Sequence, residues 1–207
     1  MAIQSDGSDA NLMQRIASGN EDAFVDLYRR TQRGVYRFAL HMSGSAEAAE
    51  DVTQEVFLAL IRHPQSFDPG RGSLSAFLYG IARKKVLRHF EQRNRSVQLP
   101  DDSGEDQVRV PLALVSHTDP LSELAENETL LSLRRAILAL PALYREVVVF
   151  CDLQELSYED TAAIVGCSVG TIRSRLHRAR AILSRRLHQT NLASSGSRCA
   201  TVKRCIA

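Results

Sequence analysis

The stretch GCSVGTIRSRLHRAR, residues 166–180, predicts a turn followed by a helix with an arginine-rich face. A shorter apolar-patterned helix precedes it, and Ser157 with Asp160 three residues later is typical of a capping box at a helix start. Gly166 supplies the backbone freedom that ends this helix, and Ser168 can cap the next one. Two helices joined in this way form a helix-turn-helix, whose second helix enters a DNA major groove.

The charge of the second helix favours DNA as its ligand. Residues 168–188 contain six arginines and no acidic residue, whereas a helix that is merely solvated normally mixes both signs. Arginine can donate to both acceptors of guanine, and serine can bind a base edge or a phosphate. We expect most of these arginines to contact phosphate, which positions a protein without reading the base sequence.

The composition of the 207-residue chain is typical of a soluble globular protein, with 44% apolar and 24% charged residues and a net charge of +2. No signal-peptide core or long apolar run is present, so we expect a cytoplasmic protein without a membrane span. None of the six histidines has a metal-ligand spacing, and neither a Gly-rich phosphate loop nor a nucleophile elbow occurs. The sequence therefore predicts no metal site and no cofactor, and it does not indicate an enzyme.

The four cysteines are too scattered for a disulfide framework. Cys151 and Cys167 lie in apolar helix or turn contexts, where a small buried side chain is expected. Cys199 and Cys205 lie in a polar tail for which we predict disorder. A redox or metal-sensing role for this second pair is the alternative.

The predicted fold class is all-α. Apolar residues recur at three- and four-residue steps through most of the chain, and no run alternates as a half-buried strand does. Asn20, Ser45 and Ser73 are the predicted N-caps of three helices in the first half. A later helix has Pro141 in its first turn and is expected to turn these side chains to the core: Leu143, Val147, Phe150 and Leu153.

The charge distribution predicts two small helical domains and a linker. Residues 96–124 lose the helical period, contain three prolines, and carry six acidic groups against Arg109 alone. Such a flexible acidic linker has a relaxed span of roughly 30 Å and a full extension of about 95 Å. The predicted boundaries are 1–95 for the first domain, 96–124 for the linker, 125–189 for the second domain and 190–207 for a disordered tail.

One helix of the first domain presents a polar face. In AEDVTQEVFLALI, residues 49–61, the spacing turns one set of side chains inward: Val52, Val56 and Leu60. Another face holds a second set: Asp51, Gln54, Glu55 and Leu58. From spacing alone this is an ordinary amphipathic helix, packed on one side and solvated on the other.

A second helix of this domain is basic. Residues 74–95 carry six Lys or Arg residues and one acidic residue, Glu91. The spacing places Lys84, Arg88 and Arg95 on one face of the helix, which could contact a row of phosphates. Phe77 and Tyr79, near its start, either stack on an unpaired base or belong to the core.

The order of these segments resembles that of bacterial extracytoplasmic-function sigma factors. DVTQEVF is followed by FDPGRGSLSAFLYGIARK, the acidic linker, LPALYREVVVF and GTIRSRLHRARAIL. The resemblance covers roughly residues 10–188, and its motifs are specific jointly although each is weak alone. It implies two helical domains, called regions 2 and 4, that bind core RNA polymerase and direct it to promoter DNA with −10 and −35 elements. Members of this family often have an anti-sigma partner.

The resemblance also implies roles for individual residues. Those that match the helix contacting the polymerase clamp are Asp51, Gln54 and Glu55. The resemblance implies that the loop over residues 67–73 holds a flipped-out base of the −10 element. The residues assigned to the −10 element are Phe67, Asp68, Arg71, Phe77, Arg83, Lys84 and Arg88. Those for the −35 element are Ser168, Thr171, Arg173, Ser174, Arg175, His177 and Arg178. Relatives commonly have Asn where Lys84 stands and Trp where Phe77 stands, so the −10 sequence does not follow by analogy.

Two other classes of protein are the alternatives. A stand-alone repressor or activator would use the helix-turn-helix, usually as a dimer on a palindrome, but leaves the basic helix and the acidic linker unexplained. An enzyme would need a reactive site that the sequence does not contain. For a sigma factor, promoter elements two helical turns apart are separated by roughly 60–70 Å, which exceeds the relaxed linker span. Core polymerase would then hold the linker extended.

Overall fold

The computed structural model describes the backbone of residues 6–96 and 130–202 and the side chains of residues 9–91 and 130–188. Within this part of the chain the structure is helical and contains no strand, which confirms the all-α prediction. The predicted acidic linker and the two tail cysteines lie outside the described side chains. None of the described helices combines the length and apolar character that crossing a bilayer requires.

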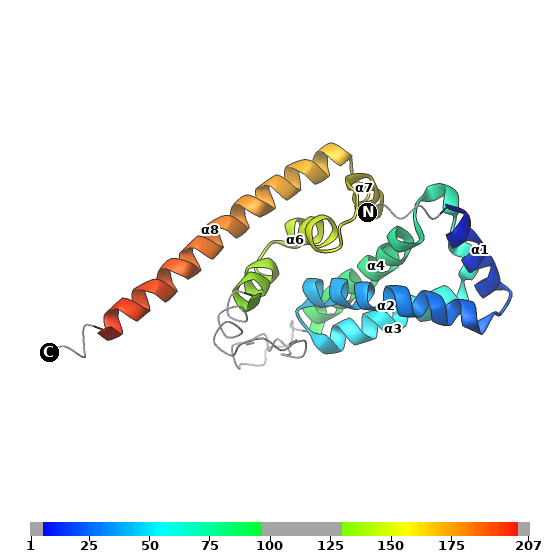
Figure 1. The fold of residues 1–207 in the computed structure, drawn as a ribbon, viewed down its shortest axis with the longest axis horizontal. Helices are drawn as coiled ribbons and strands as arrows, with labels where there is room; N and C mark the ends of the chain where they lie inside the picture. The colour runs from blue at the N-terminus through cyan, green and yellow to red at the C-terminus, as the bar shows by residue number, and fades with distance from the viewer. Residues whose placement is uncertain (1–5, 97–129, 203–207) are drawn as a thin grey trace.

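Residues 6–96 form a helical bundle from α1 (Asp6–Ala17), α2 (Glu21–Ser43), α3 (Ala46–Arg62) and α4 (Leu74–Ser96). Helices α2, α3 and α4 all contact one another, and α1 lies at the end of the bundle near the short turns η1 (Pro64–Ser66) and η2 (Pro69–Arg71) (Figure 1). The core of this bundle includes Leu27, Val35, Met42, Val56, Leu60 and Leu78. The sequence analysis did not identify α1, although Leu12, Met13 and Ile16 are buried.

The predicted N-caps of the first bundle are confirmed. The Asn20 side chain accepts a hydrogen bond from the backbone N–H of Ala23 at 2.8 Å. Ser45 and Ser73 accept equivalent bonds at 3.3 and 3.2 Å. Helix α2 ends at Gly44, whose φ of 73° is left-handed and therefore favours glycine.

The second bundle contains a helical segment over residues 130–138, α6 (Ala142–Val148), the π-helical turn η3 (Val149–Leu153), α7 (Tyr158–Val165) and α8 (Val169–Val202). Val147 and Phe150 are buried as expected, but Leu143 is 56% exposed, so its predicted core position is wrong. The prediction treated residues 142–153 as one regular helix. The wide turn at η3 interrupts that helix only after Val148. Leu143 lies before it, in the first turn of α6, where its side chain is left exposed.

The helix-turn-helix has the predicted local chemistry. The Ser157 hydroxyl accepts from the Asp160 backbone N–H at 2.9 Å and donates to its carboxylate at 2.8 Å. Gly166 ends α7 with a φ of 77°, and Ser168 accepts from the Thr171 N–H at 3.2 Å. Helix α8 continues to Val202, past residue 189 where the sequence analysis placed the start of a disordered tail.

The two bundles share one continuous hydrophobic core. The rings of Phe38 on α2 and Phe150 on η3 stack with centroids 4.7 Å apart and planes 13° from parallel. Tyr79 on α4 packs edge-on against both rings, and both phenylalanines are fully buried. Helix α7 contacts α4, so the helix-turn-helix lies against the basic helix of the first bundle (Figure 1).

Candidate nucleic-acid and polymerase interfaces

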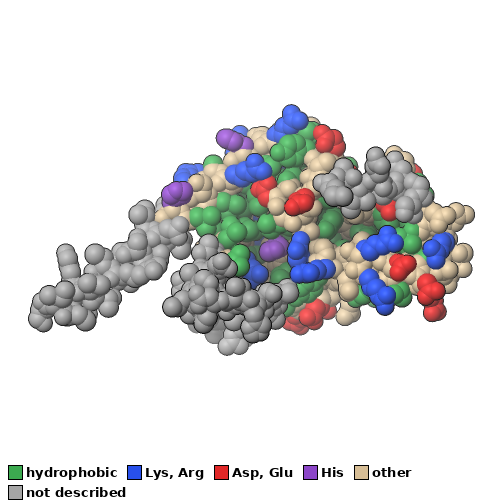
Figure 2. Space-filling view, viewed as in Figure 1, with side chains coloured by type: hydrophobic (Ala, Val, Ile, Leu, Met, Phe, Trp, Pro, Cys, Tyr) green, Lys and Arg blue, Asp and Glu red, His purple; other side chains and the backbone are tan. Residues whose placement is uncertain are grey.

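Helix α8 separates a buried stripe from an exposed basic stripe. Ile172, Leu176, Ala179 and Leu183 recur at three- and four-residue steps and pack inward. The opposite face exposes Arg173, Ser174, His177 and Arg178. Blue and purple side chains follow α8 along the upper edge of the molecule in Figure 2. The exposed arginine, serine and histidine side chains of this face are hydrogen-bond donors of the kind that contact bases and phosphates in a DNA major groove.

A hollow of about 650 Å³ opens between the start of α6 and α8. Its lining brings together five of the predicted −35 residues: Ser168, Thr171, Ser174, Arg175 and Arg178. The exposed Leu143 also lines this hollow, which explains where that side chain goes instead of the core.

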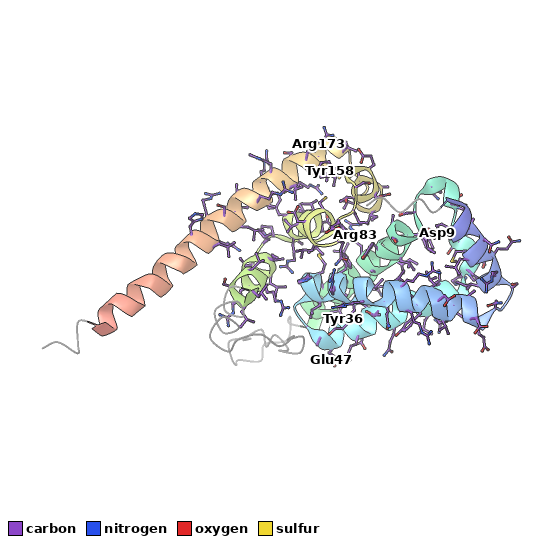
Figure 3. All side chains as sticks on the ribbon, viewed as in Figure 1. Asp9, Tyr36, Glu47, Arg83, Tyr158 and Arg173 are labelled. Carbon is purple, nitrogen blue, oxygen red and sulfur yellow. The ribbon has the colours of Figure 1, made fainter. Side chains whose placement is uncertain are left out.

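The arginines of α8 differ in their partners. Arg178 has no acidic partner within residues 9–91 and 130–188. Arg180, by contrast, forms a bidentate ion pair in which its guanidinium donates to both carboxylate oxygens of Asp152, at 2.5 and 3.2 Å. The guanidinium of Arg173 lies 5.7 Å from the ring centroid of Tyr158, at the start of α7, in a cation–π contact (Figure 3). Arg173 is therefore positioned by its own helix-turn-helix, and Arg178 is exposed without a carboxylate beside it among the described residues.

A second hollow, of about 590 Å³, lies at the loop before α4. It gathers five of the seven predicted −10 residues: Phe67, Asp68, Arg71, Phe77 and Lys84. The rings of Phe67 and Phe77 meet edge-to-face with centroids 5.5 Å apart. Phe77 is half-buried: it packs against the hydrophobic core and also lines the hollow. The far wall of this hollow belongs to α7 and consists of Ala163 and Ile164.

Small residues on α4 make this second hollow possible. Ala76, Gly80 and Lys84 follow one another at four-residue steps along α4, and all three line it. A methyl group added at Gly80 would meet no atom within 4 Å, so the helix surface is open at this point. The Ala-Gly spacing was the signal in the sequence, but the sequence analysis did not use it.

The other two predicted −10 residues lie elsewhere. Arg83 turns towards the second bundle, where its Nε donates to Glu146 at 2.9 Å (Figure 3). Arg88 is exposed and does not line the hollow. Tyr79 is also unavailable for base stacking, because its hydroxyl donates to Gln154 at 2.7 Å and its ring packs in the shared core.

Sequence analysis missed two charged residues between the bundles, Arg145 and Glu146. Burial lowers the pKa of the Arg145 guanidinium, which donates to the Met42 carbonyl at 2.5 Å and to the carbonyls of Leu138 and Leu140. Glu146 is only 2% exposed. Adjacent opposite charges inside the apolar run LYREVVVF were the available signal, since charged residues are rarely buried without partners.

Helix α3 presents the face predicted to contact polymerase. Asp51, Gln54 and Glu55 are all exposed, beside the exposed apolar side chains of Leu58 and Ile61. The Glu55 carboxylate pairs with Lys85 of α4 at 2.9 Å, so α4 anchors one end of this face. Asp51 has no ion-pair partner among the described residues.

The cysteines and histidines form no metal centre within the described residues. Cys151 and Cys167 are free thiols and half-buried rather than buried. Burial raises the pKa of the Cys151 thiol, which lies 3.5 Å from the Thr161 hydroxyl. A thiol of raised pKa carries little reactive thiolate at neutral pH.

Two sequence-family profiles match the chain. Sigma-70 region 2 matches residues 27–96, and sigma-70 region 4 matches residues 130–183. The RNA polymerase sigma factor EcfG of Rhodopseudomonas palustris is 36% identical over 73% of this chain and 77% of its own length. SigE of Mycolicibacterium smegmatis is also 36% identical, over 79% of this chain and 62% of the relative, so the chain spans less than two thirds of that protein.

A solved structure has a similar fold. The sigma factor RpoE of Bartonella quintana, crystallised with the anti-sigma factor NepR, superposes with a TM-score of 0.66 at 29% identity. The superposition covers 80% of this chain and 96% of RpoE.

Proposed function

Because this chain belongs to the extracytoplasmic-function family of RNA polymerase sigma factors, we propose that it binds core RNA polymerase and directs transcription initiation from promoters with −35 and −10 elements. Sigma factors of this family are non-catalytic initiation factors, and the family favours this function over that of a stand-alone regulator. A protein that binds core RNA polymerase acts in the cytoplasm, which is therefore its proposed location.

The hollow at the loop before α4 is the observation that carries the proposal. A stand-alone helix-turn-helix regulator has no use for a second nucleic-acid site, whereas an initiation factor must capture an unpaired base. Phe67 and Phe77 offer stacking surfaces and Lys84 offers charge for a phosphate. Extruding a base costs a few kcal/mol, which stacking and pocket contacts recover.

We assign the −35 element to α8. Arg173, Ser174, His177 and Arg178 supply base and phosphate contacts, while Ser168 and Thr171 lie at the helix start, where backbone N–H groups favour phosphate. Arg175 lines the hollow beside α6 together with Ser174 and Arg178, and its guanidinium lies 3.6 Å from the Glu146 carboxylate. The proposed domains are residues 1–95 and 125–189, with the residues between them as the connection.

We assign core polymerase to the exposed face of α3, through Asp51, Gln54 and Glu55. We also propose a protein inhibitor of the anti-sigma type, because RpoE of Bartonella quintana was solved in complex with NepR. Such a partner would compete with DNA or with core polymerase for the surfaces described above.

Sequencing of transcript starts tests the proposed function. Core polymerase from the source organism is incubated with genomic DNA, with and without the purified chain, and 5′ ends of the transcripts are mapped. We expect new start sites that share −35 and −10 sequences and that disappear with Asp51→Lys. Identical start sites with and without the chain would refute the proposal, even if the chain binds duplex DNA.

A further inference from the structure

Leu143 is the most exposed large apolar side chain in the part of the chain that the structure describes. It is 56% exposed, whereas Val147, one helical turn later on the same face of α6, is fully buried. The apolar stripe of α6 therefore continues past the edge of the core and ends in the hollow between the start of α6 and α8. A single exposed leucine needs no explanation by itself, so the surroundings of Leu143 decide what it does.

The hollow beside Leu143 is shared with residues of the proposed −35 contact. Ser174 and Arg178 lie on the exposed face of α8, and both line the hollow together with Leu143. Helix α6 contacts α8 in the second bundle (Figure 1), so a ligand that enters the hollow from α8 reaches the start of α6. Leu143 is thus placed at the edge of the proposed DNA contact, although it comes from a different helix.

The charge of the hollow favours a nucleic acid over an apolar partner. Its lining includes Arg175 and Arg178 and, among the described residues, no acidic side chain. The carboxylate of Glu146 lies 3.6 Å from Arg175, but Arg178 has no acidic partner in the described ranges. An apolar partner would have to cover Arg178 without a charge to pair with it, whereas a phosphate supplies that charge.

One group in the major groove of DNA matches an apolar side chain. The 5-methyl group of thymine projects into this groove, and it is the apolar part of the pattern by which proteins distinguish the bases. Arginine and serine side chains bind the hydrogen-bonding groups of bases and phosphates, so they do not detect the methyl group. An exposed leucine beside them supplies the apolar contact that thymine requires.

The backbone that carries Leu143 is held by several bonds. Pro141 restricts the chain at the start of α6, and its carbonyl accepts from the N–H groups of Tyr144 and Arg145, both at 2.9 Å. The Arg145 side chain donates to the carbonyl of Leu140 at 3.1 Å and ties α6 to the turn before it. A side chain on a fixed backbone contacts one place on a ligand, which favours a selective contact.

We propose that Leu143 reads a thymine of the −35 element by covering its 5-methyl group. Ser174 and Arg178 bind polar groups of the same DNA, and Leu143 adds a preference for thymine at one position. This inference rests on the proposed function, because it needs α8 to lie in the major groove of a promoter duplex. It assigns one specificity-determining residue to α6, outside the helix that supplies the other −35 contacts.

Exchange of thymine for deoxyuridine tests the contact, because it removes the methyl group and keeps the hydrogen-bonding groups. Each thymine in turn is replaced in a labelled −35 duplex from a mapped start site, and fluorescence anisotropy measures its affinity for the full chain. We expect one position at which the wild-type chain loses about fourfold in affinity, the value of one buried methyl group. Leu143→Ala is expected to bind the unmodified duplex about fourfold more weakly and to lose nothing further at that position.

Two variants serve as controls. Leu130→Ala truncates another leucine of the second bundle, which is 50% exposed and does not line the hollow, so it should respond to deoxyuridine as the wild-type chain does. Arg178→Ala should weaken binding but keep the fourfold loss at the same thymine. Because Leu143 is exposed, its truncation opens no internal cavity, and urea unfolding of Leu143→Ala should give wild-type stability.

The inference is wrong if the wild-type chain and Leu143→Ala respond equally to deoxyuridine, or if no thymine responds in the wild-type chain. It is also wrong if Leu143→Ala keeps its DNA affinity but binds core polymerase more weakly, because the hollow is then a protein contact. In these cases a loss of affinity with Arg178→Ala leaves the proposed function standing. A wild-type chain that binds the −35 duplex and a scrambled duplex equally would remove both the −35 assignment and this inference.

Discussion

Single arginine side chains on α8 have different partners although they share one helix. Arg180 is held by Asp152, and Arg175 is near Glu146, but Arg178 faces solvent without an acidic partner among the described residues. An unpaired arginine loses less on binding DNA, because no existing ion pair has to break.

Arg178→Ala is expected to weaken binding to the promoter duplex by about 1–3 kcal/mol if Arg178 reads a base. Fluorescence anisotropy of a labelled −35 duplex, taken from a mapped start site, measures the change. Arg180→Ala is the matched control and should lose less, since Asp152 already holds that guanidinium. An equal loss for Arg178→Ala on scrambled duplexes would make it a phosphate contact.

His41, near the end of α2, couples stability to pH. Burial is the main cause that lowers its pKa from 6.5 to about 4, and the neighbouring cations Arg134 and Arg37 add to the effect. Between these two pKa values the unfolded chain binds the proton more readily than the folded chain. Stability is therefore fully present above about pH 6.5 and is lost as the pH falls towards 4.

We expect this histidine to lower the free energy of unfolding by about 2–3 kcal/mol between pH 7 and pH 4.5. Urea unfolding at both values, for the wild-type chain and for His41→Gln, isolates its share from that of the carboxylates. The variant should lose that much less stability on acidification. The same acid sensitivity in both chains would show that His41 does not carry it.

At the scale of elements, α3 has one buried face and one exposed face. Val52, Val56 and Leu60 fix the helix in the bundle, so the residues between them are free to serve a partner. The ion pair between Glu55 and Lys85 links this face to α4, the helix whose residue Lys84 lines the hollow at the loop before it. The proposed polymerase contact and the proposed −10 site thus lie on adjacent helices of one bundle.

Asp51→Lys is expected to reduce affinity for core polymerase at least tenfold, because it reverses a charge at the centre of the proposed contact. Co-purification with core, followed by titration, measures this loss. Asp26→Lys is the control, since it reverses an exposed acidic residue on α2 of the same bundle. Unchanged affinity for Asp51→Lys would remove α3 from the polymerase interface.

At the scale of the whole molecule, the shared core makes the two bundles interdependent. Phe38 and Phe150 come from different bundles, yet each is fully buried by the other and by its neighbours. Separation of the bundles would expose both rings, so apolar burial stabilises the contact between the bundles, together with the ion pair between Arg83 and Glu146.

A double-mutant cycle with Phe38→Leu and Phe150→Leu measures this stacking. We expect a coupling energy of about 0.5–1.5 kcal/mol in the free energy of unfolding of the full chain. Chemical denaturation followed by circular dichroism supplies the four values. A coupling of zero would mean that the rings do not meet in solution.

The sequence by itself determined the local structure and the direction of each helix face. Caps such as Asn20, Ser45 and Ser157 act through bonds to residues three positions away, and helical period separates buried from exposed stripes over a few turns. The arginine-rich face of α8 and the polar face of α3 follow from these short-range rules. For the same reason, the fold class and both candidate surfaces could be predicted.

Only the tertiary structure decided which partner each charged side chain has. The resemblance placed Arg83 among the residues for the −10 element, but its side chain pairs with Glu146, which lies 63 positions later in the chain. Three features depend on how the two bundles pack: the burial of Glu146, the close approach of Gly34 to the Tyr79 hydroxyl that bonds to Gln154, and the wall that α7 gives to the hollow at the loop before α4. Packing between distant segments has no period in the sequence, because its energy comes from side chains that meet only once the chain has folded.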